Sequence, residues 1–242
     1  MTPPPPDIED DGAGLQAVGD LMAGLLLLFM LLAMVFSMSL SRTEQSRQVE
    51  ISALTRASED QSTLLQAVAQ NLQHAGVPVT ISPEPGVLRL GEGAIRFAPG
   101  RHDADDAETL AALSNLARAL ADTLPPYACT EDGCPDGPTA AVESVLIEGH
   151  SDAVDRLDDC DNHCLSARRA AWTRQRLLLA APELNSFRSR SGTSLFGVAG
   201  YGPDHSLSGR NAAECAREPA RCREDRRIEV RLRMETPRHL LE

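Results

Sequence analysis

The sequence predicts an α+β protein in which a single N-terminal transmembrane helix precedes an α/β sandwich, with helices packed on one mixed sheet. Three observations predict this fold class. Residues 21–40 form an apolar run without a charged residue, and all six cysteines lie beyond residue 128. From residue 63 onward, helical and strand patterns alternate along the chain. Such an alternation is typical of a domain that buries a sheet under helices.

The apolar run is long enough to cross a bilayer, because a helix of about 20 residues rises roughly 30 Å. A cleaved signal peptide is the alternative. Signal peptides begin with a positively charged region, whereas the first twenty residues here carry five acidic residues and no basic one. The sequence therefore favours a membrane span that is retained.

Two rules disagree on how this span is oriented. Arg42, Arg47 and Arg56 follow the span, and the positive-inside rule would place them in the cytoplasm. An even number of clustered cysteines instead indicates disulfides in an oxidising compartment. Because large domains cross a membrane largely regardless of charge, we expect a cytoplasmic N-terminus and a C-terminal domain outside.

The chain is predicted to divide into segments of distinct composition. The N-terminal segment is rich in proline and acidic residues, and the segment after the membrane span carries few apolar residues. The segments are a cytoplasmic tail (1–14), the transmembrane helix (15–40), a periplasmic linker (41–62), the folded domain (63–236) and a C-terminal tail (237–242).

Asp20 stands at the start of the membrane span, where a carboxylate is costly. One interpretation is structural: an acid in the headgroup region, or one that caps the helix N-terminus. Apolar residues precede Asp20, however, so the helix is predicted to begin before it. Ala23 and Gly24 share its helical face and permit close contact between helices. We expect Asp20 to take up and release an ion.

The first elements of the folded domain are a helix and a hairpin. Leu64, Leu65, Val68 and Leu72 have helical spacing, and Gly76 ends that helix. The runs VPVTI and GVLRL are rich in strand-forming residues and are separated by SPEPG, which indicates a hairpin.

The remaining elements alternate between helix and strand. The stretch ADDAETLAALSNLARALADTLP is an amphipathic helix that ends at Pro125 and Pro126. VESVLIEGHSD is a buried strand that runs into a loop, and NHCLSARRAAWTRQRLLLA is a second helix. LFGVAGYG and RRIEVRLRM are predicted as the last strands.

Four of these motifs, in this order, resemble the OmpA-like peptidoglycan-binding domain. They are IEGHSD, the series N-x-x-L-S-x-x-R-A that begins at Asn162, GYG, and DRRIEV. The resemblance covers residues 63–236. It implies a domain that binds the diaminopimelate part of the cell-wall peptide.

The resemblance also implies which residues hold that ligand. Asp152 would bind its ammonium group and Arg169 its carboxylate, while Asn162 would shape the same site. Arginine is suited to this role because it can bind a carboxylate through two parallel hydrogen bonds. The segment AVDRLDDCD, between Asp152 and Asn162, is longer than the family pattern and carries four acids. The other interpretations are a helix or turn cap for Asp152 and a surface ion pair for Arg169.

The membrane span together with this domain resembles MotB, the flagellar stator subunit, and more closely the ZorB family of Zorya anti-phage defence systems. The acidic N-terminal tail, the short linker and the cysteine-rich domain favour the ZorB family. The resemblance implies a homodimer inside a ring of multi-span MotA-like or ZorA-like partners in the bacterial inner membrane. Ions, most simply protons, would pass by Asp20. A flagellar stator and a passive wall tether are the alternatives.

The cysteines are predicted to form disulfides. Cys215 and Cys222 resemble a disulfide loop of some OmpA-like members, and Cys129–Cys134 with Cys160–Cys164 is the simplest remaining pairing. A crossed pairing stays open. Cys160, His163 and Cys164 also have residue types that bind zinc. We favour disulfides and predict no metal and no cofactor.

Two classes of function are disfavoured. The formal net charge of −12 argues against a nucleic-acid-binding protein, which would present a basic face. His150 and Asp152 are residue types of a catalytic pair, but no nucleophile motif accompanies them. The sequence therefore predicts no enzymatic activity.

Overall fold

The computed structural model describes residues 11–135, 140–154 and 160–235 of the chain. Its contacts divide the chain into a unit that ends at Ser52 and a unit that begins at Ala53. The helices are α1 (Asp11–His74), α2 (Ala107–Thr123), α3 (Asn162–Ala180) and α4 (Ala212–Arg217), with 3₁₀ helices η1 (Pro182–Ser186) and η2 (Pro219–Asp225). The strands are β1 (Thr80–Ile81), β2 (Val87–Gly91), β3 (Val142–His150), β4 (Phe196–Gly202) and β5 (Arg227–Met234).

Helix α1 belongs to the first unit up to Ser52. It begins at Asp11, within the segment 1–14 treated above as a tail, and therefore starts before Asp20 as predicted. All side chains from Val18 to Ser52 are exposed. Among the described residues, one helix is long and apolar enough to cross a membrane, and it is this one. The segments 1–10 and 236–242 lie outside the described residues.

The stretch 41–62, predicted from the sequence as a linker, is helical throughout. The few apolar residues of this stretch give no clear helical pattern. However, no glycine or proline occurs between Gly24 and Gly76 to interrupt a helix. The end of α1 is confirmed: Leu64, Leu65, Val68 and Leu72 are buried. Gly76 follows the helix in the left-handed region, at φ 75°.

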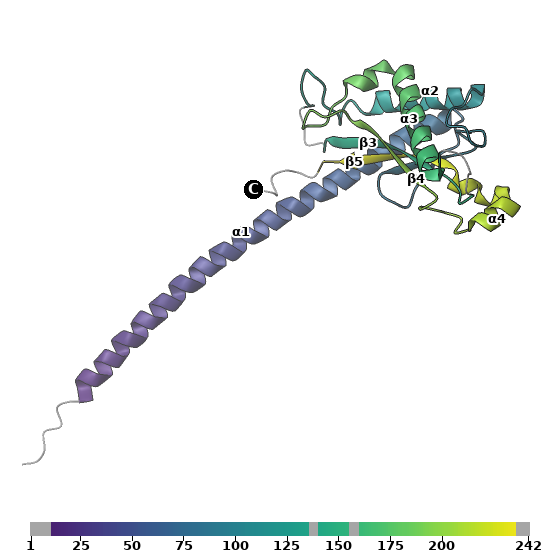
Figure 1. Cartoon of the computed structure of the whole chain (residues 1–242). Coiled ribbons are helices and arrows are strands. Elements are labelled where there is room, and N and C mark those ends of the chain that lie inside the picture. The colour runs from purple at the N-terminus through teal and green to yellow at the C-terminus, as the bar shows by residue number, and fades with distance from the viewer. Residues whose placement is uncertain (1–10, 136–139, 155–159, 236–242) are drawn as a thin grey trace, which may run out of the picture. The chain divides into compact units, whose positions relative to one another are not determined.

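The second unit contains one mixed sheet, which confirms the predicted fold class. The strand order is β1-β2-β5-β3-β4. Strands β3 and β4 are parallel, whereas the other neighbours are antiparallel. In Figure 1, α2 and α3 lie side by side over strands β3 and β5.

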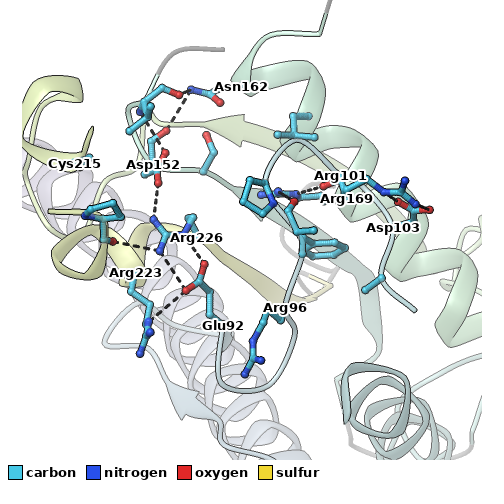
Figure 2. A pocket seen from close by; sticks show the side chains of 18 of the residues that line it. Glu92, Arg96, Arg101, Asp103, Asp152, Asn162, Arg169, Cys215, Arg223 and Arg226 are labelled. Carbon is cyan, nitrogen blue, oxygen red and sulfur yellow. Dashed lines mark hydrogen bonds and ion pairs between the residues drawn. The ribbon is translucent and has the colours of Figure 1, made fainter. Parts of the chain in front are cut away.

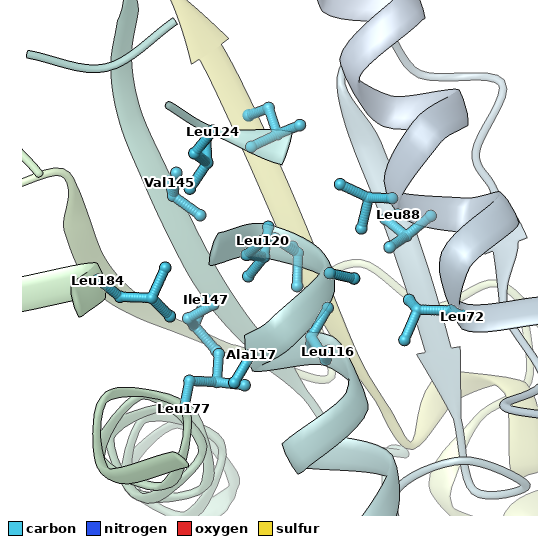
Figure 3. Packing of buried hydrophobic residues seen from close by; sticks show 14 of the residues in the cluster. Leu72, Leu88, Leu116, Ala117, Leu120, Leu124, Val145, Ile147, Leu177 and Leu184 are labelled. Carbon is cyan, nitrogen blue, oxygen red and sulfur yellow. The ribbon is translucent and has the colours of Figure 1, made fainter. Parts of the chain in front are cut away.

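One hydrophobic core joins the three long helices to one face of the sheet (Figure 3). It contains Leu72 from α1, Leu116 and Leu120 from α2, Ile147 from β3 and Leu177 from α3. Alternate residues of a strand point to opposite faces. The helices therefore all cover the face to which Ile228, Val230 and Leu232 of β5 point.

Capping residues set the limits of the two inner helices. The Asp106 side chain accepts a hydrogen bond from Thr109 N at the start of α2, which ends at Thr123 before two prolines. The Asp161 side chain accepts from Cys164 N at the start of α3. Such caps satisfy amide groups that have no partner within the helix. Both predicted helices are confirmed.

The opposite face of the sheet carries ion pairs. Arg227, Glu229 and Arg231 of β5 point there, since they alternate with core residues. Glu229 accepts from Arg89 Nε, and Arg231 Nε donates to Glu148 of β3. The sheet thus has an apolar face under the helices and a charged face on its other side.

Helix α3 lies so close to the sheet that two strand positions facing it have room only for glycine. A Cβ on Gly149 of β3 would overlap the Ser166 carbonyl oxygen, and one on Gly200 of β4 would overlap Ala167 N. This close approach fixes α3, and with it Asn162 and Arg169, relative to the end of β3.

Replacing Gly149 by alanine is expected to lower the free energy of unfolding by about 1–3 kcal/mol, because α3 must move off the strand. Thermal unfolding of the detergent-solubilised chain, followed by the fluorescence of its single tryptophan, Trp172 of α3, measures this. The control is Gly91→Ala in β2, since no atom lies within 4 Å of a Cβ placed there. An equal shift for both variants would contradict the packing described.

Candidate functional site

A cavity of about 1220 Å³ opens in the second unit beside the carboxyl end of β3. Its walls are the loop from Glu92 to Asp106, residues 151–154 after β3, the first two turns of α3, and the segment from Cys215 to Arg226. The three residues that the sequence assigns to ligand binding, Asp152, Asn162 and Arg169, all line it (Figure 2).

Asp152 is the second residue after β3 and is half-buried, with 15% of its side chain exposed. Its Oδ1 accepts from Val154 N at 3.2 Å, which shapes the turn after the strand. Its Oδ2 lies 2.6 Å from Arg226 Nη1. The carboxylate therefore has a cationic partner within the chain.

Asn162 is the first residue of α3 and is buried. Its Nδ2 donates to the carbonyl oxygens of Val154 at 2.9 Å and Asp152 at 3.3 Å. The side chain thus ties the turn after β3 to the start of α3. Residues 155–159, which include most of the acidic segment noted in the sequence, lie outside the described residues.

Arg169 lies two turns along α3 and only 6% of it is exposed. Its Nε donates to the Arg101 carbonyl oxygen at 2.9 Å and its Nη2 to the Ala98 carbonyl oxygen at 3.4 Å. The guanidinium carbon lies 4.9 Å from the centre of the Phe97 ring. These contacts hold the guanidinium in one orientation at the wall of the cavity.

Charges of both signs line the cavity but are unevenly placed. Figure 2 shows Asp152, Glu92 and Arg226 together at one side and Arg169 with Arg101 at the other. Of the lining residues, five are arginines and five are acids: Arg96, Arg101, Arg169, Arg223, Arg226, Glu92, Asp103, Asp105, Asp106 and Asp152. A ligand that carries an ammonium group and a carboxylate at separate points fits such a surface.

The structure joins the six cysteines in three disulfides: Cys129–Cys134, Cys160–Cys164 and Cys215–Cys222. Cys215 lines the cavity, and the Cys160–Cys164 bridge lies at the start of α3. The disulfide removes the thiolates that zinc would need at Cys160 and Cys164. His163 has its Nε2 3.7 Å from Asp204 Oδ1.

His150 and Asp152 do not form a pair. The His150 ring is buried on the charged face of the sheet and stacks on Tyr201, with ring centroids 5.4 Å apart. Its Nε2 is 3.5 Å from Glu229 Oε2, and both ring nitrogens lack a hydrogen bond among the described residues. Asp152 instead contacts Arg226.

Glu148, His150 and Glu229 bring three metal-ligand side chains together. Glu229 accepts from Arg89 Nε and Arg227 Nε at 2.7 Å each, and Glu148 accepts from Arg231 Nε. These arginines already balance both carboxylates. A divalent cation at these oxygens would be repelled by the guanidinium groups that already contact them, so the donor set does not suit one.

Two buried carboxyl groups near the site have lowered pKa values. Burial by itself raises the pKa of Asp225, but hydrogen bonds from Ser208, Leu207 and Ser206 bring it below its ordinary value of 3.8. Burial also raises the pKa of Glu229, but its His150, Arg227 and Arg89 neighbours lower it well below the ordinary 4.5.

Acid is therefore expected to destabilise the second unit. A carboxyl group whose folded pKa is depressed contributes stability that is complete above its unfolded pKa, at about pH 5, and is lost as the pH falls below roughly 4. Urea unfolding followed by Trp172 fluorescence at several pH values measures this. Asp225→Asn should flatten the dependence, whereas Glu183→Gln, at an exposed residue, should not. Unchanged stability of the native chain down to about pH 3 would contradict the prediction.

Sequence reasoning did not identify two residues of the cavity, Glu92 and Arg226. Arg226 is the first arginine of the DRRIEV motif, so a signal existed for it. Glu92 follows β2 in the stretch GEGAIRFAPG, which contains no pattern that indicates a role. Asp20, the proposed ion site, belongs to the first unit and is exposed.

No protein-family model matches the chain, and no curated protein matches it. Solved structures are similar to it. A MotB-like protein from Desulfovibrio vulgaris has a TM-score of 0.49 and 18% identity over 74% of this chain and 97% of that chain. The cell wall anchor of the T6SS from Pseudomonas aeruginosa has a TM-score of 0.44 and 20% identity over 71% of this chain and 97% of that chain. The periplasmic domain of Helicobacter pylori MotB has a TM-score of 0.44 and 12% identity over 67% of this chain and 82% of that chain.

Proposed function

We propose that the chain is the peptidoglycan-anchored, MotB-like subunit of an ion-driven motor in the bacterial inner membrane, acting in Zorya-type defence against phage. The observation that carries the proposal is the cavity to which Asp152, Asn162 and Arg169 all contribute. These residues come from motifs that resemble those of the OmpA-like domain, and the fold brings the motifs to one place.

The cavity is proposed to bind the diaminopimelate part of the wall peptide. Diaminopimelate carries an ammonium group and a carboxylate at the end of its side chain. Asp152 would hold the ammonium group, and Arg169, fixed by the Ala98 and Arg101 carbonyls, would hold the carboxylate. Asn162 keeps the turn that carries Asp152 in place. Two charges at a set separation select such a ligand over one that has only one of them.

The membrane span is proposed to conduct ions by Asp20. Two copies of the chain would place their helices within a ring of MotA-like or ZorA-like partners, with the C-terminal domains in the periplasm. Asp20, Ala23 and Gly24 lie on one exposed face of α1, which suits a close helix contact. Loss and gain of a charge at such a contact changes which arrangement of helices is favoured, and this can drive motion of the ring around the anchored pair.

A flagellar stator subunit would use the same groups for motility, and a passive wall tether would use the cavity without Asp20. The acidic tail and the cysteine-rich domain support the Zorya assignment over the flagellar one. The proposal assigns the chain no enzymatic reaction.

Sedimentation with purified peptidoglycan of the diaminopimelate type tests the anchoring. The full chain in detergent should pellet with the peptidoglycan and stay in solution without it. A chain that stays in solution in both cases would overturn the wall-binding part of the proposal.

A further inference from the structure

Arg226 connects two carboxylates at one side of the cavity (Figure 2). Its Nη1 lies 2.6 Å from Asp152 Oδ2, and its Nη2 lies 3.2 Å from Glu92 Oε2. Its Nε also donates to Glu92 Oε1. All three side chains are partly exposed, at 22% for Arg226, 21% for Glu92 and 15% for Asp152, so a ligand in the cavity reaches them.

This arrangement matters for Asp152, the residue proposed to hold the ligand's ammonium group. In the structure its Oδ2 already holds a guanidinium group. An ammonium group placed at the same oxygen would lie close to Nη1 and would be repelled by it. A ligand ammonium and Arg226 Nη1 therefore compete for Asp152.

We propose that Arg226 is an internal competitor for Asp152, and that Glu92 is the residue that receives it when the ligand binds. This inference rests on the proposed wall-binding function. Two of the three contacts of Arg226 with carboxylates are made to Glu92, and both persist when Nη1 leaves Asp152. The guanidinium then keeps a charged partner, which avoids the large cost of a partly buried cation without one.

The electrostatics agree with this division of the contacts. Glu92 first, and Asp152 to a smaller extent, raise the pKa of the Arg226 guanidinium above its ordinary value. Glu92 is thus the stronger partner. Arg223 Nε also lies 3.3 Å from Glu92 Oε2, so this carboxylate contacts two guanidinium groups at once.

The backbone around Arg226 is held in place, so the exchange is a movement of its side chain. Arg226 lies between η2 and β5, and the Cys215–Cys222 disulfide ties η2 to α4. The neighbouring Asp225 is buried and accepts hydrogen bonds from Leu207 N and Ser208 N. Only the guanidinium end of Arg226 has to move.

The competition predicts opposite effects for two substitutions that both remove a charge. Arg226→Gln removes the competitor, so the affinity for a diaminopimelate-containing muropeptide should rise about tenfold. Glu92→Gln removes the receiving carboxylate, so Arg226 stays on Asp152 and the affinity should fall about tenfold. In the double variant the Glu92 effect should vanish, because Glu92 acts through Arg226.

Isothermal titration of the full chain in detergent with that muropeptide measures all three affinities. Arg221→Gln is the matched control: it lies in the same segment and pairs with Glu218. Its affinity should equal that of the native chain. Thermal unfolding followed by Trp172 fluorescence checks that each variant is folded. Arg226→Lys is a second variant. Its affinity should also rise, because lysine cannot bridge two carboxylates as the guanidinium group does.

Weaker binding by both Arg226→Gln and Arg226→Lys would overturn this inference, since Arg226 would then hold the ligand itself. Unchanged affinity in Glu92→Gln would overturn it as well. In either case the native chain still binds, and the proposed function stands. If the native chain does not bind the muropeptide, the proposed function fails and this inference fails with it.

Discussion

Cells that carry the native gene cluster with Asp20→Asn are expected to lose protection against phage entirely, while their motility stays unchanged. Asparagine has nearly the shape of aspartate but cannot release a proton, so an ion-driven motor stops while the span remains intact. Acidic residues inside a membrane commonly mark proton or ion pathways, and loss of the carboxyl group is expected to block such a pathway. Plaquing efficiency, compared with cells that lack the cluster, measures the effect, with expression of the two chains made equal.

The matched control is Glu44→Gln, the same type of change on the same helix but beyond the apolar run. It should leave protection at the native level. Asp20→Glu, which keeps a carboxyl group, should retain part of the protection. Lost motility with unchanged protection would favour the flagellar alternative. Native protection together with native motility in Asp20→Asn would leave the passive tether as the function.

Arg169→Gln is expected to reduce binding of the chain to diaminopimelate-type peptidoglycan by about 10- to 100-fold, the loss that follows from removing a charged hydrogen-bonded pair of roughly 1.5–3 kcal/mol. Asp152→Asn should reduce it to a similar extent, since it removes the proposed partner of the ligand's ammonium group. Sedimentation over a range of peptidoglycan concentrations measures both affinities.

The control for Arg169 is Arg118→Gln on α2, where the side chain is exposed and donates to Asn115. It should bind as the native chain does. Because Arg169 also donates to the Ala98 and Arg101 carbonyls, Arg169→Lys is measured beside it: lysine keeps the charge but cannot reproduce the fork. If Arg169→Gln and Asp152→Asn both bind with native affinity, the cavity is not the site that binds peptidoglycan.

The sequence predicts the second unit well where the signals are local. The limits of α2 and α3 follow from capping aspartates and from prolines, and the hairpin follows from the SPEPG turn. The residues Asp152, Asn162 and Arg169 come to one cavity because they lie at a strand end and on the first turns of the next helix. Consecutive elements such as β3 and α3 usually lie next to each other in a fold, and these two do.

The missed features depend on contacts between distant parts of the chain. Glu92 and Arg226 are 134 positions apart, and their contact follows from the pairing of β2 with β5. Nothing in either local sequence indicates it. The helix over residues 41–62 escapes prediction for another reason. It has few apolar residues at helical spacing, and the absence of glycine and proline is its main local signal.

The most direct test of wall binding by the cavity is an isothermal titration of the full chain with two muropeptides, one with diaminopimelate and one with lysine at the same position. Lysine keeps the ammonium group that would contact Asp152 but lacks the carboxylate that would contact Arg169. We expect the diaminopimelate muropeptide to bind, and the affinity for the lysine muropeptide to be about 10- to 100-fold lower. Equal affinity for both, or binding of neither, would contradict it.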